Sequence, residues 1–220
     1  MTGSASEPRF EELPAVLPIF PLTGVLLLPR GHLPLNIFEP RYLAMTRDAM
    51  GGERMIGMIQ PSDPADLGDN PPVYRTGCAG RISSFSETED GRFLITLTGV
   101  ARFDVKDELP LRSGYRRVAA DWERYRADLA PDEGAVDRDR LVAALRVFFR
   151  VHGLSADWDT IRQTPDERLV TSLAMICPFA PNEKQALLEA SDLGERAKVM
   201  IALIEMAVVE GAKEGEGSRH

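Results

Sequence analysis

The most apolar stretch of the chain, residues 17–45, is interrupted by five prolines and reads LPIFPLTGVLLLPRGHLPLNIFEPRYLAM. Proline cannot donate to a sheet ladder, so it is confined to the ends, edges and bulges of strands. The spacing therefore predicts three short strands, LPIF, VLLL and LPLNIF, none long enough to span a membrane. Pro40 is typical of the first turn of a helix and Gly51-Gly52 of a helix end, which predicts one short helix between them.

Strand-length apolar segments continue to about residue 122. MIGMIQP predicts a buried strand, and the acidic loop SDPADLGDNPP follows it. Four further segments are rich in the residue types that favour strands: VYRTGCAGRISSF, RFLITLTG, ARFDVKD and YRRVAADW. Asp90-Gly91 between the first two is a typical hairpin turn. Residues 14–125 are therefore predicted to form a mostly antiparallel β-barrel with one short helix.

The apolar pattern acquires a helical period after residue 131. An amphipathic stripe with spacings of three and four is formed by Leu141, Leu145, Phe148 and Phe149. Thr164, Pro165 and Glu167 predict a second helix that begins with a capping box. NEKQALLEA and LGERAKVMIALIEMAVVEG predict two more helices. The fold class is thus α+β, with a helical bundle over residues 132–211 that packs on the barrel because it carries more apolar surface than it can bury alone.

The composition adds to the predicted fold only at the two ends of the chain, where it predicts flexible tails. The chain has 220 residues, of which 44% are hydrophobic and 27% charged, as is ordinary for a globular protein. Residues 1–13 and 212–220 are mostly small or polar and are predicted to be flexible tails. The start shows no basic segment followed by an apolar core, and the two cysteines suit a reducing compartment, so we expect a cytoplasmic protein.

The charge disfavours nucleic acid as a partner. The net charge is −8, whereas phosphate-driven binders normally carry a basic surface. One basic concentration stands out, formed by Arg112, Arg116, Arg117, Arg124 and Arg126. Asp121 and Glu123 interrupt it, which favours a solvated strand face over a phosphate-binding stripe.

No pattern of catalytic residues is found. The chain has no Gly-Lys pair for a phosphate-binding loop and no Gly-x-Ser-x-Gly elbow. The histidines, His32, His152 and His220, are too far apart for the short spacings of a metal site. We therefore predict no enzyme activity, no catalytic residues, no cofactor and no metal site.

Charged and aromatic residues meet where the third predicted strand gives way to the helix. Phe38, Glu39, Arg41 and Tyr42 lie there. Glu39 and Arg41 can form a structural pair, with Glu39 at the positive end of the helix. Alternatively, the four residues form a peptide-binding rim, since Arg and Tyr are enriched at protein interfaces. The sequence is compatible with both arrangements.

The order of these motifs resembles the amino-terminal substrate-binding domain of Lon proteases. The resemblance covers residues 14–120, and the helical segment ICPFAPNEKQALLEASDLGERAKVMIALIE is also similar to helices that follow this domain. Gly99, Arg102 and Phe103 match the Gly-x-x-Arg-Phe turn of the family. The resemblance implies a PUA-like barrel, the pseudouridine-synthase-and-archaeosine-transglycosylase type, and recognition of unfolded or tagged protein segments.

The chain carries neither the Walker loop nor the serine-lysine dyad of a complete Lon protease. We therefore expect a non-enzymatic protein-binding module for unfolded or flexible polypeptide segments, acting as an adaptor or regulator of proteolysis. Its expected partners are such segments and a protease or chaperone system, without a membrane; a weak homodimer is also considered. The alternatives are an RNA-binding PUA-like module and a hydrolase with a dispersed site.

Overall fold

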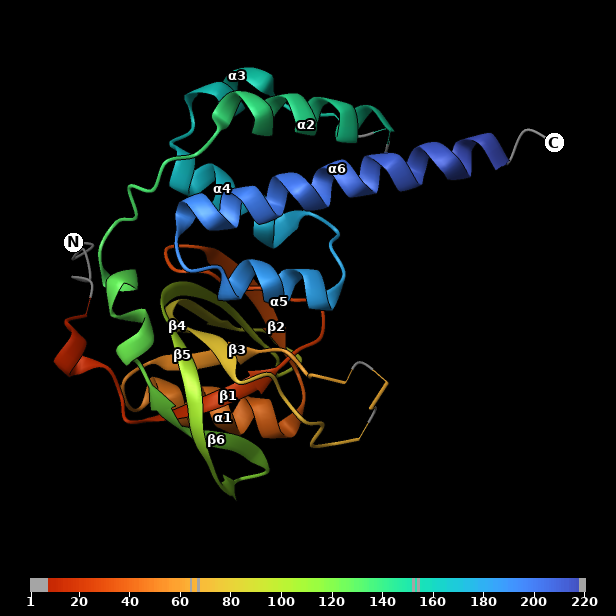
Figure 1. Ribbon diagram of the computed structural model, residues 1–220. Helices are drawn as coiled ribbons and strands as arrows, with labels where there is room; N and C mark the ends of the chain where they lie inside the picture. The colour runs from red at the N-terminus through yellow and green to blue at the C-terminus, as the bar shows by residue number, and fades with distance from the viewer. Residues whose placement is uncertain (1–7, 64, 67, 152, 154, 218–220) are drawn as a thin grey trace. The chain divides into compact units, whose positions relative to one another are not determined.

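The computed structural model describes residues 8–217, apart from residues 64, 67, 152 and 154. It divides after Pro131 into two compact units. The first unit is a mixed α/β structure built on a six-stranded sheet, and the second is helical (Figure 1).

The strands pair in the order β2-β5-β4-β3-β1-β6. Their bounds are β1 (Val16–Pro21), β2 (His32–Ile37), β3 (Met55–Ile59), β4 (Thr76–Glu87), β5 (Phe93–Arg112) and β6 (Tyr115–Asp121). Every pair is antiparallel except β1 with β3. The first part of β5 pairs with β2 and its second part with β6. Because β6 also pairs with β1, five strands form a ring of pairings, and among the described residues β2 joins this ring only by pairing with β5.

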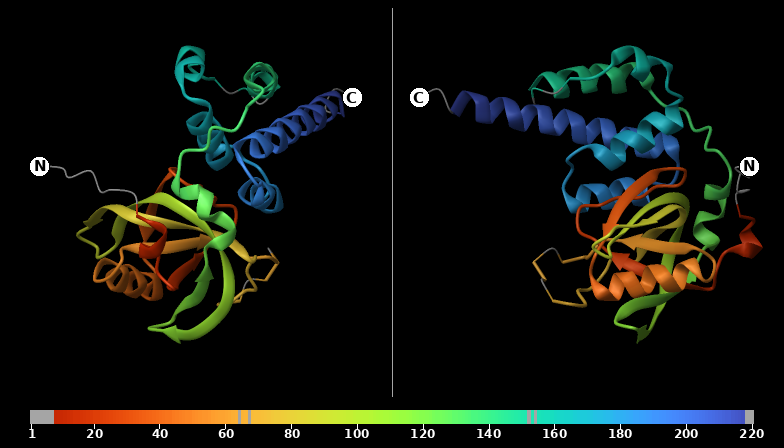
Figure 2. Two further views of the ribbon diagram at one scale, coloured as in Figure 1. Left: turned by 60° about the vertical axis from the view of Figure 1, so that its left-hand side comes forward. Right: turned by 180° about the vertical axis from the view of Figure 1, so that it is seen from behind.

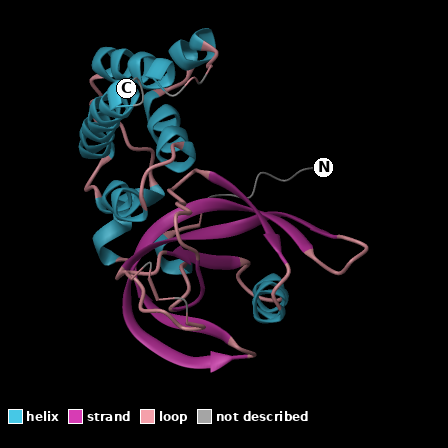
Figure 3. Ribbon diagram, turned by 90° about the vertical axis from the view of Figure 1, so that its right-hand side faces the viewer, coloured by secondary structure: helices cyan, strands magenta, loops and turns pink. Residues whose placement is uncertain are grey.

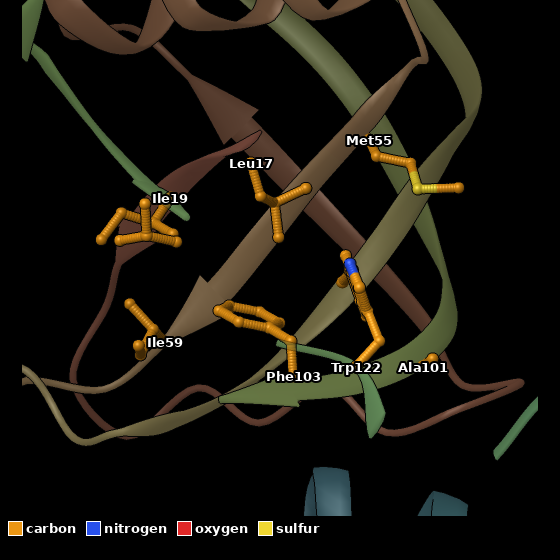
Figure 4. Close-up of a cluster of buried hydrophobic side chains, with 9 residues drawn as sticks. Leu17, Ile19, Met55, Ile59, Ala101, Phe103 and Trp122 are labelled. Atoms are coloured by element: carbon orange, nitrogen blue, oxygen red, sulfur yellow. The ribbon is translucent and has the colours of Figure 1, made fainter. Parts of the chain in front are cut away.

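The strands curve strongly in Figure 3, and the residues buried between them form an apolar cluster. Leu17, Phe103 and Trp122 point toward one another from different elements in Figure 4, and all three are buried. The Phe103 ring fills space that a side chain at Gly57 or Gly77 would need, since a Cβ atom at either glycine would lie 2.7–2.9 Å from that ring. These two glycines therefore let β3 and β4 lie close over the aromatic centre of the core.

The strand predicted for VLLL is wrong. Leu26, Leu27 and Leu28 are buried, yet they form a loop that takes no part in the sheet. The loop turns back at once, with Gly31 donating to the Leu28 carbonyl at 2.9 Å. The loop lies close to Gly99, where a Cβ atom would be 1.9 Å from the Leu28 carbonyl oxygen.

The predicted hairpin and first helix are confirmed. Gly91 joins β4 to β5 with φ of +79°, a conformation that glycine adopts without steric cost. RFLITLTG and ARFDVKD, predicted as separate strands, are continuous in β5. Helix α1 (Pro40–Met50) has Pro40 in its first turn and Gly51 as its C-cap.

Two 3₁₀ helices, η1 (Phe10–Glu12) and η2 (Glu123–Leu129), flank the sheet in sequence. Phe10 and Leu13 are partly buried against the core, although they lie in the segment predicted as a tail. Residues 1–7 of that tail, and residues 218–220 at the other end, lie outside the described residues.

The second unit contains α2 (Arg138–Val151), α3 (Trp158–Gln163), α4 (Asp166–Ile176), α5 (Pro181–Glu189) and α6 (Leu193–Gly217). Helix α6 contacts α2, α4 and α5 (Figure 2). Leu141, Leu145 and Phe148 of the predicted stripe are buried. The PUA-like barrel, the helical bundle over residues 132–211 and the packing of that bundle on the barrel stay predictions.

The predicted capping box of the second helix is absent. The Thr164 hydroxyl donates to the Thr160 carbonyl of α3 at 2.8 Å, and Glu167 accepts from the Asp132 amide at 3.2 Å. Helix α4 begins at Asp166, so Pro165 is its N-cap residue and not the first helical residue that the sequence predicted. Within the described residues, no helix combines the length and apolar composition that crossing a bilayer requires.

Candidate functional site

A groove of about 480 Å³ opens beside the junction between β2 and α1. Three segments form it: residues 20–23 at the end of β1, residues 34–42 from β2 into α1, and the loop between β3 and β4, which projects from the sheet in Figure 1. Most of its lining is apolar: Phe20, Pro21, Leu22, Pro34, Leu35, Phe38, Tyr42, Pro61 and Pro71.

One wall of the groove belongs to an edge strand. Gly99 donates to the Gly31 carbonyl at 2.8 Å, and the pairing of β2 with β5 continues from there without a register shift. Backbone groups alternate between the two sides along an antiparallel strand. Leu33, Leu35 and Ile37 therefore direct their backbone groups toward β5, whereas His32, Pro34 and Asn36 direct theirs away from it.

The edge of β2 that faces away from β5 is called the free edge below. Proline has no N–H to donate. Because the backbone groups of Pro34 face away from β5, the pairing of β2 with β5 loses no hydrogen bond at this position. The free edge thus presents the carbonyl of Pro34 and both backbone groups of Asn36. Because both residues line the groove, an extended chain lying there could pair with them.

The two aromatic side chains of the predicted rim have opposite environments. Phe38 is 60% exposed, at the end of β2. Tyr42 is only 7% exposed and packs on Phe20. Burial raises the pKa of Tyr42, and the nearby Arg41 partly offsets this. Phe38 is therefore the accessible apolar contact of the rim, while Tyr42, expected as an exposed anchor, forms part of its floor.

Glu39 and Arg41 are joined in an ion pair at the mouth of the groove. Arg41 donates to Oε2 of Glu39 from Nε at 3.0 Å and from Nη2 at 2.9 Å. Its third nitrogen, Nη1, donates to the carbonyl of Asp69 at 2.8 Å. Glu39 is the N-cap residue of α1 but makes no side-chain cap. Arg41 thus links the start of α1 to the β3–β4 loop.

A second arginine holds the same loop. Arg116 of β6 donates to the Pro71 carbonyl at 2.7 Å and makes two hydrogen bonds to Glu108, at 2.6 and 2.9 Å. These bonds lower the pKa of the Glu108 carboxyl. The sequence gives no direct sign of this contact, because Arg116 and Pro71 are far apart along the chain and neither belongs to a motif.

The five arginines that were predicted to form a basic strand face contact carboxylates or backbone carbonyls of the protein. Arg116 bonds to Glu108 and Arg117 to the Pro110 carbonyl. The ion pairs of the other arginines are Arg112 with Asp48, Arg124 with Asp104, and Arg126 with Glu11 and Glu123. This arrangement disfavours a phosphate-binding stripe and with it the RNA-binding alternative.

Candidate metal ligands do not gather in the described part of the chain, where no group of three His, Cys, Asp or Glu side chains is placed to hold an ion. The His32 ring lies 3.1 Å from the Thr98 hydroxyl, and His152 and His220 lie outside the described residues. Cys78 and Cys177 are buried free thiols, and burial raises the pKa of Cys177 to about 11.

The amino-acid sequence of the chain is similar to those of known proteins. The family model of the ATP-dependent protease La (LON) substrate-binding domain matches residues 16–206. A Lon protease of Anaeromyxobacter dehalogenans is 26% identical over 204 residues, covering 88% of this chain and 23% of that protein. Lon protease 2 of Sorangium cellulosum is 29% identical over 200 residues, covering 86% of this chain and 24% of that protein. The chain thus spans about a quarter of the length of these curated relatives.

Two solved structures share the fold. A Lon N-terminal domain protein from Xanthomonas campestris matches with a TM-score of 0.58 and 24% identity, covering 85% of this chain and 97% of that one. The N-terminal domain of Mycobacterium avium complex Lon protease matches with a TM-score of 0.58 and 18% identity, covering 86% and 97% respectively.

Proposed function

Because the chain belongs to the ATP-dependent protease La (LON) substrate-binding domain family, we propose that it binds extended polypeptide segments of protein substrates in the groove beside β2. In this role it is a protein-binding module of a proteolytic system, an adaptor or regulator that captures unfolded or flexible segments and performs no chemical step itself.

The observation that carries this proposal is the free edge of β2 within an apolar groove. An extended peptide can add to a strand edge, where main-chain hydrogen bonds supply affinity and pockets for alternate side chains supply specificity. The groove provides apolar surface from Leu35 and Phe38 beside that edge. Strand β2 has six residues, or about 20 Å at 3.3 Å per residue. So short an interface is typical of transient encounters, and we expect micromolar affinity.

The first test removes one hydrogen-bond donor from the free edge. Asn36→Pro deletes the backbone N–H that faces the groove, whereas Asn36→Ser keeps it and serves as the matched control. Binding of a fluorescent, uncharged peptide of alternating Val and Ser residues is measured by anisotropy. We expect the proline variant to bind at least about five-fold more weakly and the serine variant to bind like the wild type. Equal affinity for two folded variants would contradict pairing at this edge.

A second test leaves the protein unchanged. Alternate amide nitrogens of the same peptide are methylated, in two versions that differ only in which set carries the methyl groups. Pairing with one strand edge uses only one set, because successive N–H groups of an extended chain point to opposite sides. One version should therefore lose binding and the other retain it. Equal effects of the two versions would refute strand addition.

A third test concerns the accessible rim residue. Phe38→Ser removes the exposed ring at the end of β2, and Leu111→Ser removes a comparably exposed apolar side chain, 51% exposed, from the end of β5. Neither change opens the core, so both variants should remain folded. We expect weaker peptide binding for Phe38→Ser alone. Equal binding by the two variants would remove Phe38 from the site.

A further inference from the structure

The groove is acidic as well as apolar. Its described lining carries three carboxylates, Glu39, Asp66 and Asp69, and one guanidinium, Arg41. The ion pair between Arg41 and Glu39 neutralises one of these carboxylates. Asp66 and Asp69 are exposed and form no ion pair within the described residues. Two negative charges therefore remain on the wall formed by the β3–β4 loop.

Two backbone carbonyls of the loop that carries these carboxylates accept hydrogen bonds from arginines. The Asp69 carbonyl accepts from Arg41 and the Pro71 carbonyl accepts from Arg116. Oδ1 of Asp66 accepts from the Gly68 amide at 2.8 Å, which leaves Oδ2 for another donor. The bonds that anchor the loop thus use backbone carbonyls and one carboxylate oxygen, while the negative charge of both side chains stays available to the groove.

From this charge we propose, building on the proposed function, that the groove selects extended segments in which a lysine or arginine stands next to an apolar residue. Opposite charge on the two sides of an interface favours the correct partner and penalises a like-charged one. A long cationic side chain suits this site, because its methylene stem can cover apolar surface such as Phe38 while its charged end reaches a carboxylate. Acidic segments should bind worst.

The inference is tested with three labelled peptides that share one extended apolar sequence and differ at a single central position. That position holds lysine, norleucine, which has a similar shape without the charge, or glutamate. We expect the lysine peptide to bind about three- to ten-fold more tightly than the norleucine peptide, and the glutamate peptide to bind most weakly. The difference should shrink as ionic strength is raised to about 1 M, because salt screens exposed charges.

Two double variants locate the effect. Asp66→Asn with Asp69→Asn removes both groove charges and keeps an acceptor for the Gly68 amide; it should equalise the lysine and norleucine peptides. Glu133→Gln with Asp139→Asn removes two exposed carboxylates from the second unit and should keep the full preference. A preference that survives the first pair, or disappears with the second, would overturn the inference.

The same measurements separate this inference from the function on which it rests. If the norleucine peptide binds and lysine gives no advantage, charge selection is wrong and the peptide groove stands. If none of the three peptides binds the folded protein, the proposed function itself fails.

Discussion

Tyr42 lies against Phe20 with ring centroids 4.2 Å apart and an angle of 38° between the ring planes. This contact fixes the first turn of α1 on the end of β1. The Arg41 guanidinium lies 4.7 Å from the centroid of the same Tyr42 ring. The aromatic pair therefore supports the groove from beneath, and the ion pair of Arg41 with Glu39 lies at its mouth.

We expect Tyr42→Ala to lower the free energy of unfolding by about 3 kcal/mol, because it leaves a cavity beside Phe20. Tyr42→Phe keeps the ring and should change stability by less than about 1 kcal/mol. Urea denaturation of both variants measures the two values. A Tyr42→Ala variant as stable as Tyr42→Phe would show that the aromatic contact does not anchor the helix.

The pair of Glu108 with Arg116 should make stability depend on pH. Folding lowers the pKa of Glu108 through its bonds to Arg116. A carboxyl with a lowered folded-state pKa stabilises the protein above its unfolded pKa, near 4.3, and this contribution is lost as the pH falls through the folded value. Because the Glu108 side chain is 45% exposed, we expect Glu108→Gln to cost only about 1 kcal/mol at neutral pH.

The check is the difference in unfolding free energy between the wild type and Glu108→Gln, followed from neutral pH to about pH 3. It should narrow below the unfolded pKa of glutamate. A difference that is constant over this range would indicate that the carboxylate charge does not contribute.

Gly99 should tolerate no side chain. A Cβ atom there would lie 1.9 Å from the Leu28 carbonyl oxygen and 2.8 Å from the Leu28 carbonyl carbon, both backbone atoms that cannot move independently of the buried loop. We expect Gly99→Ala to destabilise the protein by more than about 3 kcal/mol. Gly91→Ala is the comparison, since Gly91 has a positive φ but open space around it. It should cost about 1 kcal/mol. Thermal unfolding of the two variants in one buffer compares their losses of stability. A smaller loss for Gly99→Ala than for Gly91→Ala would contradict the expected clash with the Leu28 backbone.

The buried pair of Arg102 and Asp128 ties η2 to β5. The carboxylate of Asp128 accepts from the Arg102 amide and Nε, both at 2.9 Å, and from Nη2 at 2.7 Å. Asp128→Ala leaves a buried guanidinium without this counter-charge and should cost about 3–5 kcal/mol. Arg102→Met combined with Asp128→Leu should cost less than the single change, because no charge stays buried. Denaturant titrations measure the free energy of unfolding of both variants. A double variant that is less stable than Asp128→Ala would contradict this expectation.

Cys177 should be unreactive in the folded protein. Burial raises the pKa of its thiol to about 11. Since the thiolate is the nucleophile, only about one thiol in a thousand is ionised at pH 8. We expect slow modification of Cys177 by a thiol reagent under native conditions and rapid modification in denaturant, followed separately from Cys78 by mass spectrometry. Native and denatured rates that agree would show that the thiol is accessible.

Features that depend on neighbouring residues could be predicted from the sequence alone. The Asp90-Gly91 turn, the proline start of α1 and the apolar stripe of α2 follow from local backbone preferences and from the period of apolar side chains. The resemblance also drew attention to Gly99, Arg102 and Phe103, although not to what each contacts.

Only the tertiary structure decided how distant segments meet. It showed that the VLLL segment is a buried loop against Gly99, that the free edge of β2 borders a groove, and that Tyr42 lies beneath the rim instead of on it. It also brought Arg41 and Arg116 to the carbonyls of one loop. An apolar run signals burial equally for a strand and for a loop, and the partner of an arginine depends on chain segments dozens of residues away. The sequence could therefore draw attention to Phe38, Glu39, Arg41 and Tyr42. The segments that line the groove beside these four residues, and their division into exposed contact, ion pair and buried support, came from long-range packing.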